Sequence, residues 1–125
     1  MKRVTDHIRD HALSVVGYYE SHRVPSIEEL AVSEWNPTFE RMMRNRLIMG
    51  AFRYGLFRDK LAGKHGWDLV GYLKRKVADY EATGNLEFLV DAANMALLEF
   101  TAPTHPNAHI SATDCTGVHC ERRLT

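Results

Sequence analysis

The sequence predicts an all-α fold: a compact helical bundle of four to five helices that ends in an irregular, His-rich C-terminal tail. Apolar residues recur at the helical spacing of three and four positions in five segments of the chain. Breaks rich in proline and glycine separate these segments, and no stretch alternates with period two as a half-buried strand would. We therefore expect a single helical domain over residues 1–125, with a helical core over 1–103 and an irregular extension over 104–125.

The first two expected helices cover residues 5–22 and 26–33. Thr5 can cap the first helix, because its hydroxyl can accept from an unpaired N–H group of the first turn. Ser26 and Glu29 have the spacing of a capping box, in which the N-cap side chain and the residue three positions later satisfy each other's backbone N–H groups. This pattern predicts that the second helix begins directly after Ser26.

The third expected helix begins at Asn36-Pro37 and runs to Tyr54. Proline suits the first helical turn, because the N–H that it lacks would have no intrahelical partner there. Gly55 is a typical C-terminal stop. The basic, glycine-bearing segment 56–66 is expected to be a loop.

The last two expected helices cover residues 67–82 and 86–100, and the segment Thr83-Gly84-Asn85 separates them. Nearly every residue of the final helix is apolar or small, which predicts that most of its circumference is buried.

Composition and charge exclude several classes of protein. Sixteen basic residues balance sixteen acidic ones, whereas a protein that coats nucleic acid is usually strongly basic. No apolar run reaches the roughly 18–20 residues that span a bilayer, and no signal peptide follows Met1. We therefore expect a cytoplasmic protein without a membrane or nucleic-acid partner, in which Cys115 and Cys120 are free thiols.

Three polar residues interrupt the apolar final helix. Glu87, Asp91 and Asn94 follow the spacing i, i+4, i+7 and so share one face. Burying a carboxylate costs several kcal/mol unless it is paired or binds a metal. The partner is either an arginine of another helix, in a structural ion pair, or a divalent cation or the polar groups of a ligand, and both interpretations stay open.

Basic and aromatic residues elsewhere fit an anionic ligand. Arg46 and Arg53 are seven positions apart on the third helix and share a face, and a guanidinium matches phosphate or carboxylate. Tyr54 can stack on a base or belong to the core. Arg75 lies in a basic run that is either a solvated face or, in an oligomer, part of a shared anion site.

The tail contains His105 and His109, followed by Asp114 and His119. Imidazole and carboxylate suit zinc and similar ions. The alternative is that the segment folds over the mouth of a pocket, with His105 or His109 donating hydrogen bonds. No sequence pattern of a known nucleophile, P-loop or zinc protease is present.

Three segments carry a resemblance to known proteins: residues 49–55 (MGAFRYG), 72–75 (YLKR) and 83–94 (TGNLEFLVDAAN). Over about residues 36–100 the chain resembles small bacteriophage proteins and, more remotely, the phage dATP/dGTP diphosphohydrolase branch of the all-α, MazG-like nucleotide pyrophosphohydrolases. The resemblance implies antiparallel helices, an oligomer, and Mg²⁺ held by an EExxE motif and a later ExxD motif.

The metal motifs of that superfamily are incomplete in this sequence. Asp91 matches the last acid of ExxD, but Phe88 occupies the first acidic position and Glu87 is displaced by one. Glu28-Glu29 is followed by Val32 at the third acidic position of EExxE. The departures favour binding over catalysis.

The leading hypothesis is a homo-oligomeric phage protein of the infected host cell that sequesters a nucleotide-like small molecule, such as an immune signal, without turnover and without a cofactor. One alternative is a Mg²⁺-dependent (d)NTP pyrophosphohydrolase, and a second is a phage inhibitor that binds a host protein. The expected ligand-binding residues are Arg46, Arg53, Tyr54, Arg75, Glu87, Asp91, Asn94, His105 and His109.

Overall fold

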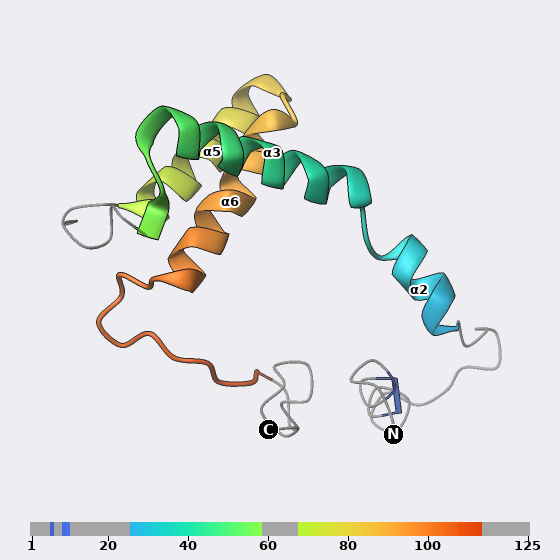
Figure 1. The fold of residues 1–125 in the computed structure, drawn as a ribbon. Helices are drawn as coiled ribbons and strands as arrows, with labels where there is room; N and C mark the ends of the chain where they lie inside the picture. Colours follow the sequence, from blue (N-terminus) through green and yellow to red (C-terminus); the bar gives the residue numbers. More distant parts are fainter. Residues whose placement is uncertain (1–5, 7–8, 11–25, 59–67, 114–125) are drawn as a thin grey trace. The chain divides into compact units, whose positions relative to one another are not determined.

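The computed structural model describes residues 6, 9–10, 26–58 and 68–113. The chain divides into two compact units, one formed by Asn36–Ala108 and the other by Met1–Trp35 with His109–Thr125. The larger unit contains the helices α3, α5 and α6, and the other contains α2 (Figure 1). The expected single domain over 1–125 stays a prediction.

Helix α2, Ile27–Ser33, begins where the capping-box pattern predicts. The Ser26 hydroxyl accepts a hydrogen bond from the backbone N–H of Glu29 at 3.1 Å. Asp6, Arg9 and Asp10 are helical, and the rest of the predicted helix 5–22 lies outside the described residues.

Helix α3, Pro37–Tyr54, has the predicted bounds. The Asn36 side chain accepts from the backbone N–H of Phe39 at 2.9 Å, which satisfies one of the unpaired donors of the first turn. Gly55 ends the helix with a φ of 88°, a conformation that glycine adopts without the steric penalty of a side chain. The predicted loop over 56–66 is wrong at Phe57 and Arg58, which are helical, because the Gly55 turn lets helical backbone resume within two residues.

Helices α5, Leu69–Thr83, and α6, Glu87–Thr101, are joined by a short turn. Helix α5 begins two residues later than predicted, because the Asp68 carboxylate caps it by accepting from the Gly71 N–H at 2.9 Å. Gly84 ends α5 in the left-handed conformation, with a φ of 72°.

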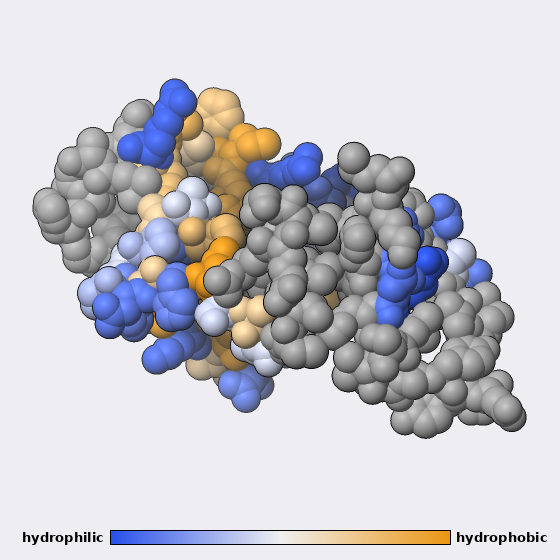
Figure 2. Space-filling view, turned by 90° about the horizontal axis from the view of Figure 1, so that it is seen from below, coloured by the Kyte–Doolittle hydropathy of each residue, from blue (hydrophilic) through white to orange (hydrophobic). Residues whose placement is uncertain are grey.

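Helix α6 packs against both α5 and α3 (Figure 1). Leu69, Val90 and Ala92 are the buried hydrophobic residues of the described part, and two of them lie in the first half of α6. The prediction that most of α6 is buried is wrong for its second half, since Leu97 and Phe100 are exposed. The buried residues of α6 all lie between Val90 and Asn94. Figure 2 shows hydrophobic side chains reaching the surface beside hydrophilic ones.

Residues 102–113 form the irregular extension that the prolines predict, and residues 114–125 lie outside the described part. The Glu99 carboxylate holds the start of this extension by accepting from the backbone N–H of Thr104 at 2.7 Å and from its hydroxyl at 3.0 Å. The described residues contain no strand, which agrees with the all-α prediction. None of their helices combines the length and the apolarity that crossing a membrane requires.

Candidate functional site

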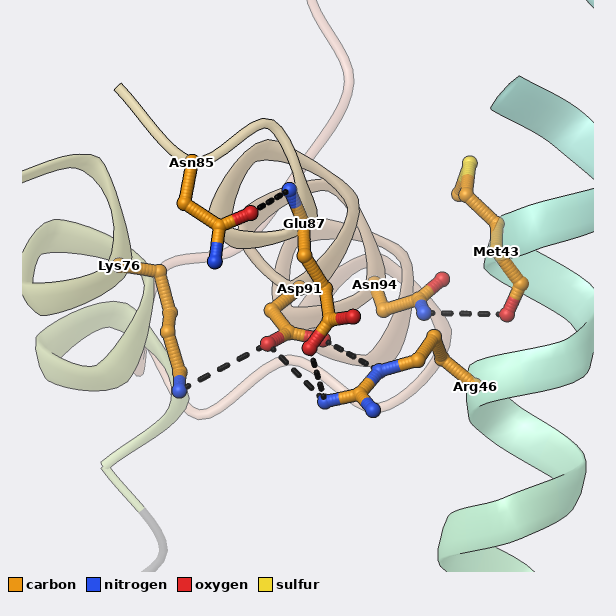
Figure 3. Close-up of polar contacts among 7 residues, drawn as sticks. All are labelled: Met43, Arg46, Lys76, Asn85, Glu87, Asp91 and Asn94. Carbon is orange, nitrogen blue, oxygen red and sulfur yellow. Dashed lines mark hydrogen bonds and ion pairs between the residues drawn. The ribbon is translucent and has the colours of Figure 1, made fainter. Parts of the chain in front are cut away.

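Asp91 of α6 lies at the centre of a charged cluster in the larger unit (Figure 3). From α3, Arg46 donates to both carboxylate oxygens, Nε to Oδ1 at 3.1 Å and Nη2 to Oδ2 at 3.3 Å. From α5, the Lys76 ammonium lies 3.7 Å from Oδ2. Only 13% of the Asp91 side chain is exposed. Three helices therefore bring two cations to one nearly buried carboxylate, which offsets the cost of its burial.

Glu87 completes this cluster at its exposed edge. One of its carboxylate oxygens lies 3.5 Å from Nη2 of Arg46, and half of its side chain is exposed. The hydrogen bond to Asp91 raises the pKa of Arg46 above its usual value, while partial burial lowers it and the charges of Asp91 and Glu87 raise it. Arg46 therefore stays protonated except in strongly alkaline solution. The stability that its pairing with Asp91 contributes is lost only as the pH rises past the raised pKa.

Two interpretations of the polar residues on the face of the final helix were left open, and the first is observed: an arginine of another helix pairs with Asp91. Glu40 and Arg44, four positions apart on α3, form a further ion pair at the surface, with 2.7 Å between Oε1 and Nη2.

Asn94, one turn further along α6, is 3% exposed. Its Nδ2 donates to the backbone carbonyl of Met43 on α3 at 3.1 Å (Figure 3). Its Oδ1 is buried and has no hydrogen-bond partner within the described part of the chain. The side chain therefore ties α6 to α3 on one side and leaves an acceptor unpaired on the other.

A cavity of about 280 Å³ lies between the second half of α3 and the middle of α6. Arg46, Arg53 and Tyr54 line it from α3, and Asp91 and Asn94 line it from α6. Five of the nine predicted ligand-binding residues thus surround one space. The remaining lining is mostly apolar and includes Leu47, Met49, Phe57, Met95 and Leu98.

The other four predicted residues lie elsewhere. Glu87 contacts Arg46 but does not line the cavity. Arg75 is exposed on α5, where its guanidinium lies 5.1 Å from the centre of the Tyr72 ring. The Nδ1 atom of His105 accepts from the backbone N–H of Asn107 at 2.9 Å, and the residue does not line the cavity. His109 belongs to the other unit.

Sequence reasoning missed Lys76 and Gly50. Lys76 is one of three consecutive basic residues, and nothing in that run marks it as the member that turns toward Asp91. Gly50 lines the cavity from the interior of α3. A glycine within an otherwise regular helical pattern was the available signal for it, because glycine is unfavourable there without a specific reason.

Metal binding in the tail stays a prediction, since Asp114 and His119 lie outside the described residues. Within the residues that the structure does describe, no group of three or more His, Cys, Asp or Glu side chains is placed to hold a metal ion.

Comparisons with protein-family models, with curated proteins and with solved structures found no match to this chain.

Proposed function

We propose that this protein binds a small, anionic, nucleotide-like molecule in the cavity between α3 and α6 and releases it unchanged. The observation that carries this proposal is the composition of the cavity wall, in which two arginines, a tyrosine and the paired Asp91 join a largely apolar lining. Such a wall offers cationic donors to a phosphate and apolar surface to a base.

Arg46 is suited to anion recognition because the protein holds its guanidinium in place. Its Nε and Nη2 atoms donate to Asp91, and no interaction of its Nη1 atom with another described residue is found. An arginine fixed in this way loses less side-chain entropy when it binds a ligand than a free surface arginine does. Arg53, which lines the same cavity two turns later, supplies a second positive charge.

The pairing of Asp91 favours binding over hydrolysis. Asp91 is the residue that matches the ExxD motif, and in a Mg²⁺-dependent hydrolase its oxygens would be ligands for the metal. Here both oxygens contact Arg46, and one also lies near Lys76. A divalent cation at Asp91 would have to displace the side chains of Arg46 and Lys76. In this proposal the carboxylate therefore positions Arg46.

Titration calorimetry with adenosine monophosphate, dATP and a cyclic dinucleotide tests the proposal. We expect Arg53→Ala to weaken binding of the best ligand by roughly tenfold, the loss of one charge-assisted hydrogen bond. Arg53 is exposed, so the fold should be unaffected. Arg41→Ala is the matched control, because Arg41 is an exposed arginine of the same helix that does not line the cavity.

The same samples distinguish the alternatives. Chromatography of dATP after incubation with protein and Mg²⁺ should return dATP alone, and released pyrophosphate would instead support the hydrolase. Wild-type protein that binds no nucleotide would reject the proposal and leave the inhibitor hypothesis, which recovery of a defined host protein on the immobilised chain would support. The phage setting, the immune signal and the homo-oligomer implied by the resemblance belong to the same proposal.

A further inference from the structure

Gly50 occupies an unusual position for a glycine. It lies in the interior of α3, where glycine is less favourable than alanine. The described glycines with positive φ are Gly55 and Gly84, so a left-handed backbone conformation does not explain Gly50. Apart from its chain neighbours and the backbone of its own helix, a methyl group built at its Cα would meet no atom within 4 Å, so close packing against a neighbouring helix does not explain it either.

Gly50 lines the cavity between α3 and α6. Arg46 precedes it by four positions and Arg53 follows it by three, so the three residues share one face of α3. Ala51, the next residue, also lines the cavity and is small. The part of the cavity wall that α3 forms therefore has no bulky side chain at Gly50 and Ala51. An arginine lies about one turn away on either side.

From this arrangement we infer that Gly50 is a specificity-determining residue, which lets one flat ring system of a mononucleotide lie directly on the backbone of α3 while an arginine reaches its phosphate. The inference rests on the proposed function and narrows its ligand. Met95 and Leu98 of α6 line the same space and supply apolar surface to it. Asn94 of α6 also lines this space.

The size and charge of the cavity restrict the ligand further. A volume of about 280 Å³ is just below the roughly 300–1,000 Å³ typical of ligand pockets, which suits one base with its sugar. Two arginines and one aspartate line the space, so its net positive charge is small. We therefore expect a monophosphate to bind more tightly than a triphosphate or a cyclic dinucleotide.

The decisive experiment combines Gly50 variants with matched ligands. Calorimetry is carried out with adenosine monophosphate, ATP and a cyclic dinucleotide on wild type, Gly50→Ala, Gly50→Leu and the control Ala96→Leu. Ala96 is an exposed residue of α6 that does not line the cavity. One added methyl group should weaken monophosphate binding by roughly tenfold, and Gly50→Leu should abolish it, while the control binds like wild type.

Urea unfolding of the same proteins separates loss of the site from loss of the fold. Gly50→Ala should shift the unfolding midpoint to higher urea, because alanine is the better helix former and nothing obstructs its methyl group. If Gly50→Ala binds the monophosphate more weakly and is also more stable, the inference is supported. Damage to the fold would instead lower both the affinity and the stability.

Three results would contradict these claims, and each would overturn a different one. Gly50→Leu that binds the monophosphate like wild type overturns the role of Gly50 and leaves nucleotide binding intact at another place. Wild-type protein that prefers ATP or the cyclic dinucleotide overturns the assignment of a single ring and a single phosphate. Wild-type protein that binds none of the three ligands removes the proposed function, and the inference with it.

Discussion

At the scale of single residues, Asn94 combines a satisfied donor and an unsatisfied acceptor in one buried side chain. An unpaired buried acceptor costs about 1–3 kcal/mol, whereas a typical hydrogen bond contributes about 1 kcal/mol. We predict that Asn94→Leu, which has a similar volume and neither polar group, leaves the free energy of unfolding unchanged or raises it by about 1 kcal/mol. Urea denaturation measures this difference.

Two further variants give the prediction its controls. Asn94→Ala should lower the stability, because it removes the bond to Met43 and leaves a void between α3 and α6. Asn45→Leu replaces an exposed asparagine of α3 and should change little. If Asn94→Leu lost about 2 kcal/mol or more, Oδ1 would have to be satisfied after all, for instance by an ordered water.

The charged cluster shows how far single residues are predictable from sequence. The spacing of Asp91 and Asn94 placed both on one face, and the cost of burying a carboxylate called for a cationic partner. The sequence did not indicate that Lys76 would be the second cation beside Asp91. Consecutive helical residues point about 100° apart, so Lys76 meets Asp91 while Arg75 lies over the Tyr72 ring. Only the packing of α5 on α6 selects between them.

At the scale of elements, the N-cap of α3 is a testable source of stability. Asn36 accepts from the Phe39 N–H, and replacing such a cap with alanine costs about 1 kcal/mol. We expect Asn36→Ala to lower the free energy of unfolding by this amount in urea denaturation. Asn45→Ala, at an exposed position inside the same helix, should leave the stability equal or slightly higher, because alanine is the better helix former. Equal losses from both variants would contradict a capping role.

Helix boundaries were predictable where a local hydrogen bond or backbone conformation fixes them. Ser26, Asn36 and Gly55 act through groups within three residues in sequence or through their own φ, so their patterns predicted α2 and α3 correctly. Burial was harder, because it depends on which helices lie alongside. The apolar pattern of α6 predicted burial of most of its circumference, yet Phe100 is 73% exposed. Sequence periodicity identifies an apolar face without showing what covers it.

At the scale of the whole molecule, we predict self-association from the exposed apolar surface and the charge balance. Phe52 of α3 is 87% exposed, and Ile48, one turn earlier, is 53% exposed. Exposed large apolar side chains on adjacent turns are typical of protein interfaces. The formal net charge of zero means that two copies do not repel each other through their overall charge. The occupant that we expect on this face of α3 is therefore a second copy of the chain.

Light scattering tests this prediction: the wild-type protein should have a mass of at least about twice the 14.3 kDa of one chain. Phe52→Glu should shift the mass toward that of one chain, since a carboxylate at the interface must be desolvated. Ala82→Glu, at an exposed position of α5, is the control and should keep the wild-type mass. A wild-type mass of one chain at the concentrations used for calorimetry would contradict the prediction. Because α3 and α6 of one chain line the cavity, a monomeric Phe52→Glu variant should still bind the monophosphate, which separates self-association from ligand binding.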